Sequence, residues 1–294
     1  MKQSSTPMPY IAMLLAIALY SVMDATMKFS AIAVGAYSAT FLRNVLGFAL
    51  VLPLWLKEGA RWPARPALIL HIKRGIVAAG MAVSFFYALV RLPLAEAIAL
   101  AFVAPLFALF LAAVLLGEKI ERKSIWASLL GLVGVSIIGF IGRTEGTAHP
   151  EATLGIVAVL CSAFLYAWNL ILQRQQALVA RPTEVAVFQT AVAAITLSIA
   201  APWLLVTPTI SAWQGIAASA LLATASLMLS SWAYGRAEAQ ALVPFEYTAF
   251  LWAALIGWLA FAEQVTIPTV LGAALIVVGC LVAAPKRRIE QTAL

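Results

Sequence analysis

The stretch RLPLAEAIALAFVAPLFALFLAAVLLGE at residues 91–118 decides the fold, because a second copy of its pattern, RAEAQALVPFEYTAFLWAALIGWLAFAE, occupies residues 236–263. The two segments align without a gap at a shift of 145 residues; both begin with Arg, end with Glu and are largely apolar in between. The glycines that follow also match, since Gly134 falls on Gly279, and the earlier part of each half aligns at a shift of 146. The second half of the chain therefore repeats the first.

Composition identifies the class of protein. Hydrophobic residues make up 64% of the 294 residues and charged residues only 11%, whereas a soluble domain carries about 25% charged residues. A helix needs about 20 consecutive, mostly apolar residues to cross a bilayer. Ten segments meet this requirement: residues 10–31, 36–56, 72–91, 94–116, 124–142, 153–173, 184–205, 213–235, 241–262 and 268–284. The sequence thus predicts an all-α, polytopic membrane protein with ten transmembrane helices.

The number of spans in each half predicts how the repeats are related. Residues 1–147 and 148–294 each hold five predicted spans, and an odd number places the second copy upside down in the bilayer. Inverted repeats packed around a central cavity are typical of secondary transporters, which bind substrate at the repeat interface. Each half is therefore predicted to be one five-helix domain of such a transporter.

The distribution of basic residues predicts the orientation. With both termini in the cytoplasm, 15 of the 19 Lys and Arg residues, among them Lys73 and Arg74, fall in cytoplasmic segments. Lys28, Arg91 and Arg143 fall outside, and Arg43 lies within a span. This asymmetry follows the positive-inside rule. The net charge of +7 then reflects topology and contact with anionic membrane lipid, and nucleic acid is not an expected partner.

Motifs for other functions are missing from the sequence. It has no Walker-type phosphate loop and no plausibly spaced Ser/His/Asp set, so ATP-driven transport and hydrolase chemistry are not expected. The two histidines, His71 and His149, are far apart and lie in or beside predicted loops, which argues against a metal site. The chain is therefore predicted to be neither an enzyme nor a protein that needs a metal or cofactor.

Charged residues inside predicted spans mark the first candidate site. A charge within the hydrocarbon costs about 2.5–3.5 kcal/mol, so it needs a partner and usually has a function. Asp24 lies in the first span on the same helix face as Tyr20 and Lys28, and Arg43 lies in the second span at a similar depth. We expect Asp24 and Arg43 to pair, either in the transport path or as a static ion pair that joins the two helices.

A matching polar cluster is predicted in the second half. Asn169 lies 145 positions after Asp24, and Gln189 lies 146 positions after Arg43. Asn169 belongs to a continuous polar stripe of the sixth span, and Glu246 of the ninth span lies at a similar depth to Gln189. Such a stripe either lines a wet cavity or hydrogen-bonds a neighbouring helix.

Aromatic residues and prolines complete the candidates. Most aromatic side chains in such a chain pack in the core or face lipid, but five lie near the polar stripes or the helix breaks and are predicted substrate contacts: Tyr20, Tyr87, Phe102, Trp168 and Tyr247. Pro105 and Pro244 occur in corresponding halves, and each removes a backbone hydrogen bond from its helix. Paired breaks point to the central site of a transporter, unless they are only structural kinks.

Two segments also resemble a known family. LPLAEAIALAFVAPLF at residues 92–107, with LGEK at 116–119, resembles the EamA-type domain of the drug/metabolite transporter superfamily, and residues 243–263 with the glycines at 272–279 resemble a second such domain. Length and architecture are most similar to the YddG-type aromatic amino-acid exporters of bacterial inner membranes. The resemblance implies two inverted five-helix repeats, a central cavity lined mainly by helices 1–4 and 6–9, peripheral helices 5 and 10, and alternating access.

The predicted function is secondary transport of amino acids across the bacterial inner membrane, with export as the expected direction and a preference for aromatic and other apolar side chains. Residues 85–96, FFYALVRLPLAE, are also similar to family members that import S-adenosylmethionine or riboflavin. Uptake of such a metabolite is therefore the alternative. The sequence leaves the oligomeric state open and is compatible with a monomer.

Overall fold

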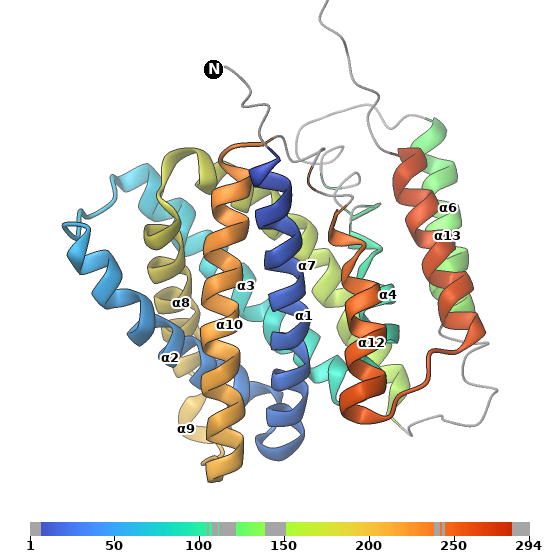
Figure 1. Cartoon of the computed structure of the whole chain (residues 1–294), viewed down its shortest axis with the longest axis horizontal. Coiled ribbons are helices and arrows are strands. Elements are labelled where there is room, and N and C mark those ends of the chain that lie inside the picture. Colours follow the sequence, from blue (N-terminus) through green and yellow to red (C-terminus); the bar gives the residue numbers. More distant parts are fainter. Residues whose placement is uncertain are drawn as a thin grey trace, which may run out of the picture.

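Helices make up the whole of the fold in the part of the chain that the computed structural model describes, which comprises residues 7–104, 106–107, 111, 122–138, 151–237, 242 and 245–283. No strand occurs among these residues. The helices in chain order are α1 (Met8–Val34), α2 (Ala36–Lys57), α3 (Arg65–Leu89), α4 (Leu94–Ala101), α6 (Arg122–Ser136), α7 (Ala152–Val179), α8 (Pro182–Ser198), α9 (Ala201–Leu204), α10 (Ile210–Tyr234), α12 (Ala249–Phe261) and α13 (Ile267–Ala283) (Figure 1).

Five of these helices, α1, α2, α3, α7 and α10, are long and apolar enough to cross a bilayer, and α12 and α13 are shorter apolar helices. Large apolar side chains such as Ile32, Ile195 and Leu251 are exposed on the outside of the bundle, where lipid would cover them. A helix satisfies its backbone hydrogen bonds internally, so it can lie in hydrocarbon. The predicted class, a polytopic all-α membrane protein, is confirmed.

The repeat in the sequence is also a repeat of helices. α10 begins and ends 145 residues after α3, and α7 ends 145 residues after α1. α1 packs along α10, and their equivalents α7 and α3 pack along each other in the same way, so this contact occurs twice (Figure 1). α2 pairs with α8, and α6 with α13, which are each other's equivalents. Two repeats related by an approximate two-fold axis would pair in this way.

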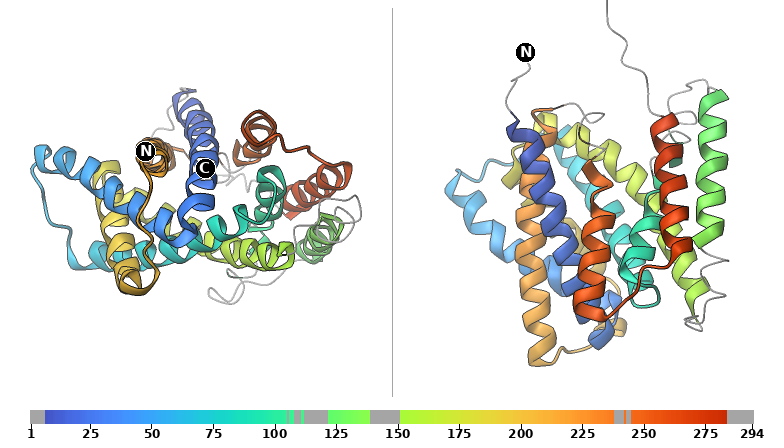
Figure 2. Two further views of the ribbon diagram at one scale, coloured as in Figure 1. Left: turned by 90° about the horizontal axis from the view of Figure 1, so that it is seen from below. Right: turned by 45° about the vertical axis from the view of Figure 1, so that its right-hand side comes forward.

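The helices α6 and α13 stand together at one edge of the molecule (Figure 2). Glycines allow their close approach, since a Cβ atom on Gly134 would lie 2.6 Å from the carbonyl oxygen of Gly272. Small residues serve such packing in membranes, where the hydrophobic effect does little to hold helices together. No described residue of either helix lines the central cavity, which agrees with the peripheral position implied for helices 5 and 10.

Two predicted spans differ from the helices that form. The third span is predicted at residues 72–91, but α3 begins at Arg65 with a proline in its first turn, where an N–H has no intrahelical partner. His71, predicted in or beside a loop, and Arg74, predicted in a cytoplasmic segment, therefore lie inside the helix and are buried. The predicted span 184–205 divides into α8 and α9, and Pro202 lies in the first turn of α9.

Some predictions fall outside the described residues. Pro105 and Pro244, the two predicted helix breaks, lie there, as does the predicted boundary between the repeats at residues 147–148. The described chain ends α4 at Ala101 and turns at residues 102–103, directly before the first of these prolines.

Candidate substrate cavity

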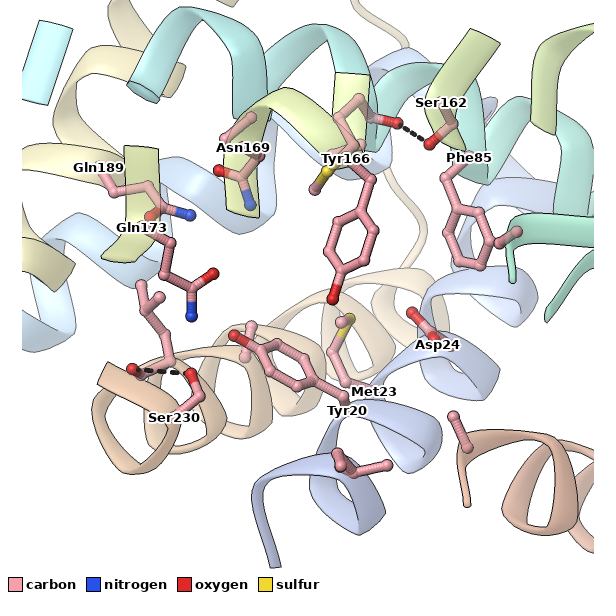
Figure 3. Close-up of a pocket in the computed structure, with 18 of the residues that line it drawn as sticks. Tyr20, Met23, Asp24, Phe85, Ser162, Tyr166, Asn169, Gln173, Gln189 and Ser230 are labelled. Atoms are coloured by element: carbon pink, nitrogen blue, oxygen red, sulfur yellow. Dashed lines mark hydrogen bonds between the residues drawn. The ribbon is translucent and has the colours of Figure 1, made fainter. Parts of the chain in front are cut away.

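A cavity of about 280 Å³ lies within the bundle and is lined by helices of both halves: α1, α2, α3, α4, α7, α8, α10 and the segment that leads into α12. Figure 3 shows Tyr20 of α1 and Tyr166 of α7 projecting into this space, with Asn169 and Gln173 of α7 facing the same space. The volume is close to the lower end of the range for small-molecule sites, about 300–1,000 Å³. A position between the two repeats is the usual one for a transporter's substrate site.

Asp24 and Arg43 both line this cavity but do not form the expected ion pair. None of the ion pairs among the described residues joins them. The Arg43 guanidinium instead places Nη1 3.3 Å from the sulfur of Met23 and lies over the ring of Phe86, 5.1 Å from its centroid. The prediction of a direct pair is wrong because the direction of each side chain around its helix axis, as well as its depth, selects its partner.

Arg74 of α3 is a second cation of the cavity lining, and it is held by amides. Its side chain, 1% exposed, donates from Nε to Asn169 Oδ1 at 3.1 Å and from Nη1 to Gln176 Oε1. Gln176 Nε2 in turn contacts His71 Nδ1, and His71 Nε2 lies 3.0 Å from Glu184 Oε1. This chain of contacts joins α3, α7 and α8.

Glu246 is held by two tyrosine hydroxyls. Tyr166 donates to Oε2 at 2.9 Å and Tyr234 donates to Oε1 at 2.6 Å, so each carboxyl oxygen has a donor. A hydrogen bond to a charged group contributes about 1.5–3 kcal/mol. Both carboxyl oxygens of Glu246 therefore have a neutral hydrogen-bond donor. Asp24, which lines the same cavity, has no such donor among the described residues.

The remaining predicted residues of the lining are Tyr20, Phe102, Gln189 and Tyr247. The rings of Phe102 and Tyr247 meet edge to face with their centroids 5.2 Å apart. Gln189 Oε1 is buried and has no hydrogen-bond partner in the described part of the chain. A buried acceptor without a partner carries a desolvation cost, so a ligand that donates to it would relieve that cost.

Two predicted contacts do not reach the cavity. Trp168 is 40% exposed on the outside of α7, because it lies one residue, or about 100°, around the helix from Asn169. Tyr87 lies outside the lining, with its ring centroid 3.5 Å from the guanidinium carbon of Arg91. The assignment of both aromatic residues to the cavity is wrong, since nearness in sequence to a polar stripe does not place a side chain on the same face.

A buried ion pair lies near the end of the bundle where α1 meets α4 and α12. Lys28 of α1 donates to the carboxylate of Glu263 and, at 2.8 Å, to the carbonyl oxygen of Leu92. The other oxygen of Glu263 accepts from the backbone N–H of Leu94 at 2.7 Å. The pair therefore joins helices of both repeats. Lys28, which the count of basic residues assigned to the outer side, is buried within α1.

Arg74 and Tyr234 are two polar cavity residues that the sequence reasoning missed. A signal for Arg74 was present, because Arg74, Ala78, Met81 and Phe85 recur at spacings of four, three and four and all line the cavity. Such spacing places side chains on one helix face. Tyr234 offers no such signal, since it ends an apolar helix and acquires its partner, Glu246, only in the folded protein.

The family of the chain follows from a comparison of its two halves with known proteins. The model of the EamA-like transporter family matches residues 7–140 and matches again at residues 153–284. The chain belongs to the EamA-like transporter family. It is therefore a transporter and not an enzyme, and its cavity is lined from both matched segments.

Named relatives of this EamA-like transporter carry small molecules. The chain is 26% identical to the pseudopaline exporter of Pseudomonas aeruginosa over 264 residues, which cover 89% of this chain and 90% of that protein. It is 25% identical to the riboflavin transporter of Brucella anthropi over 245 residues, which cover 81% and 84%. A protein of known crystal structure, 26% identical, superposes with a TM-score of 0.65 over 95% of this chain and 97% of that chain.

Proposed function

We propose that this EamA-like transporter moves amino acids. The supporting observation is that Asp24 and Arg43 place opposite charges on one cavity lining without forming an ion pair. A guanidinium has five N–H donors, and in the described part of the chain those of Arg43 make one contact, to the sulfur of Met23. The ammonium group of a zwitterion can bind the Asp24 carboxylate while its carboxylate binds Arg43 in a bidentate manner. A zwitterion thus supplies partners that the described residues do not supply.

Large apolar side chains are the proposed preference. Phe85, Phe86 and Phe102 contribute apolar surface to the cavity that also holds Asp24 and Arg43. Burial of apolar surface gains about 25 cal/mol per Å², in proportion to area and with no demand for one shape. Selectivity should therefore be broad, with phenylalanine and tryptophan bound more tightly than glycine or aspartate.

Alternating access is the proposed mechanism. A secondary transporter opens its central site to one side of the membrane at a time as its repeats move against each other. The Lys28–Glu263 pair joins α1 of the first repeat to the end of α12 in the second. Opening the bundle between these helices requires the pair to break, so we assign it to the closed state of that end.

The bacterial inner membrane is the proposed location, with both termini in the cytoplasm and export as the direction. The asymmetric distribution of Lys and Arg supports the orientation, and similarity to the pseudopaline exporter supports export. A reporter that is active only in the periplasm, fused after Leu294, should be silent. An active reporter would overturn the orientation and the inverted arrangement of residues 1–147 and 148–294.

Counterflow in proteoliposomes tests the substrate class. Protein in vesicles loaded with unlabelled phenylalanine should accumulate labelled phenylalanine, and tryptophan should compete better than glycine or aspartate. Asp24→Asn and Arg43→Gln should each weaken this exchange, whereas Trp168→Phe, on the exposed face of α7, should not. Absence of phenylalanine exchange by the unaltered protein would overturn the proposal.

Uptake of a metabolite such as riboflavin or S-adenosylmethionine is the second candidate. Similarity to the riboflavin transporter of Brucella anthropi favours it. The same vesicles decide between the two, because riboflavin and S-adenosylmethionine can be added as competitors. Exchange of either compound without exchange of phenylalanine would replace the amino-acid proposal and leave the family and the fold in place.

A further inference from the structure

His71, Gln176 and Arg74 form a chain of hydrogen bonds whose direction follows from their chemistry. A guanidinium can only donate, so Gln176 presents Oε1 to Arg74 and its amino group to His71. Nδ1 of His71 must then accept. The single proton of the neutral imidazole therefore sits on Nε2, where it is donated to Glu184 Oε1 at 3.0 Å.

A second proton on His71 would disrupt this order. Protonated Nδ1 becomes a donor and needs an acceptor, which Gln176 supplies when its amide turns so that Oε1 faces the imidazolium. The amino group of Gln176 then faces Nη1 of Arg74, donor against donor, and that hydrogen bond is lost. Asn169 still accepts from Nε of Arg74, so the guanidinium keeps its place while Nη1 loses its acceptor.

Two charged groups lie close to His71. Glu184 of α8 lies 3.0 Å from Nε2, and Arg74 lies three residues later on the same helix. Among the side chains that the structure describes, α7 contributes the amide of Gln176, and α8 also contributes the ring of Phe188, stacked with its centroid 4.9 Å from that of the imidazole. Glu184 further lines a second cavity of about 110 Å³, which gives His71 a polar neighbour that is separate from the substrate site.

We propose that His71 couples proton binding to substrate binding in this transporter. Proton uptake by His71 turns Gln176 and frees Nη1 of Arg74 to bind the substrate carboxylate together with Arg43. By linkage, a carboxylate bound at Arg74 favours proton uptake at His71 to the same extent. His71 and Gln176 are positioning residues here, since they reach the substrate only through Arg74. The inference rests on the proposed function and adds a proton that binds together with the substrate.

Nitrogen NMR tests the arrangement without any substrate. The chain has two histidines, so protein labelled with ¹⁵N-histidine gives two sets of imidazole signals, and His149→Gln assigns those of His71. At about pH 8 we expect a bare Nδ1 and a protonated Nε2, and both nitrogens should be protonated as the pH falls toward about 5. A proton on Nδ1 with a bare Nε2 at high pH, or no second protonation, would overturn the inference whatever the protein transports.

Two substitutions separate the roles of the two ring nitrogens in transport. His71→Asn places an acceptor at the position of Nδ1 and cannot be protonated, so it should hold Gln176 and Arg74 in the resting order. His71→Gln reaches the position of Nε2 but leaves Gln176 without its acceptor, so it should release Arg74. His71→Asn is therefore expected to resemble the wild type at high pH, and His71→Gln the wild type at low pH.

Phenylalanine exchange at about pH 5 and about pH 8 supplies the readout. The wild type and the control variant His149→Gln should show a KM that is lower at the lower pH by about fivefold or more, the usual size of a coupling between two sites. The KM of His71→Asn should agree at the two pH values within about twofold. His71→Asn with the wild-type pH dependence would overturn the coupling, even where exchange of phenylalanine establishes the proposed function.

Discussion

Asp24 and Lys28 lie about one helical turn apart on α1, and each has an oppositely charged residue that could pair with it. In the described part of the chain, only one of the two forms an ion pair. Asp24 shares a cavity with Arg43, and no ion pair joins the two. Lys28, four residues later, is joined to Glu263 across the two repeats. The sequence predicted the first pair and not the second. Position along a span indicates depth in the bilayer, but only the packed helices determine which side chains meet.

The end of α12 explains why Lys28 finds a partner. Ala262 adopts a left-handed conformation, with φ of 53°, so the chain leaves the helix sharply and the N–H of Glu263 returns to the carbonyl of Gly257 at 3.1 Å. A Cβ atom on Gly257 would lie 2.8 Å from the Glu263 carboxylate. The glycine therefore makes room for the carboxylate that Lys28 contacts. Among the described residues, no comparable turn directs Asp24 toward Arg43, so both charges remain available to a ligand.

Breaking the Lys28–Glu263 pair should have the largest effect on stability. Lys28→Met leaves the Glu263 carboxylate without its cation where the two side chains are 7% and 18% exposed. Removal of one partner of a buried pair typically costs about 3–5 kcal/mol. Thermal unfolding in detergent measures the loss. Adding Glu263→Gln, which keeps an acceptor for the N–H of Leu94, should recover part of it.

The pair formed by Arg91 and Glu151 supplies the control. Arg91 Nε lies 2.7 Å from Glu151 Oε2, but the glutamate side chain is 52% exposed. Solvent screening limits such a pair to about 1 kcal/mol at most, so Glu151→Gln should change the unfolding temperature little. Equal losses from Lys28→Met and Glu151→Gln would show that burial does not set the two pairs apart.

Tyr234→Phe should have the next largest effect on stability, because it removes one of the two hydroxyl groups that donate to the Glu246 carboxylate. The substitution removes the hydroxyl that donates to Oε1 at 2.6 Å, and loss of a hydrogen bond to a charged group costs about 1.5–3 kcal/mol. The same unfolding assay applies. Tyr10→Phe, at a ring that is 37% exposed, is the matched control and should stay within about 0.5 kcal/mol of the wild type. A loss no larger than that of the control would mean that Tyr166 alone satisfies Glu246.

Much of the fold could be predicted from the repeat and the composition. The register of 145 residues predicts where α10 begins and ends once α3 is known, because equivalent helices have equivalent lengths. Apolar runs predicted the class and most spans. The start of α3 was missed because Lys73 and Arg74 resemble the charged flank of a span. Arg74 lies inside the bundle only because amides of α7, about a hundred residues later, accept its hydrogen bonds.

The sequence predicted which polar residues line the cavity better than it predicted which side chains contact one another. Asp24, Arg43, Asn169, Gln189 and Glu246 all line one cavity, because a polar side chain in a span avoids lipid and faces the interior. Aromatic side chains are stable on either side of a helix. The same rule could therefore not distinguish Tyr20 and Phe102, which line the cavity, from Trp168, which faces outward.

Removing the charge of Asp24 should have a small effect on stability and a large one on binding. In the described part of the chain, Asp24 has no ion-pair or hydrogen-bond partner. Asp24→Asn therefore leaves no group without a partner, and the free energy of unfolding should change by less than about 1 kcal/mol. Loss of a charged partner for the substrate ammonium should weaken phenylalanine exchange about tenfold or more. Arg43→Gln should behave in the same way toward the carboxylate. A stability loss equal to that of Lys28→Met would contradict the contrast between the two pairs.

Gln189→Met should have the smallest effect on stability. The buried Oε1 of Gln189 already has no partner in the described residues, so its replacement by an apolar side chain of similar shape removes an unsatisfied acceptor and strands nothing. Stability should be unchanged or rise slightly, by up to about 1 kcal/mol. Asn169→Leu is the control, because it leaves Nε of Arg74 without the acceptor that now lies 3.1 Å away and should lose about 1.5–3 kcal/mol. If Gln189→Met weakens phenylalanine exchange and leaves the unfolding temperature unchanged, the free acceptor binds the substrate. A clear loss of stability would mean that Gln189 has a partner within the protein, as Lys28 does and Asp24 does not.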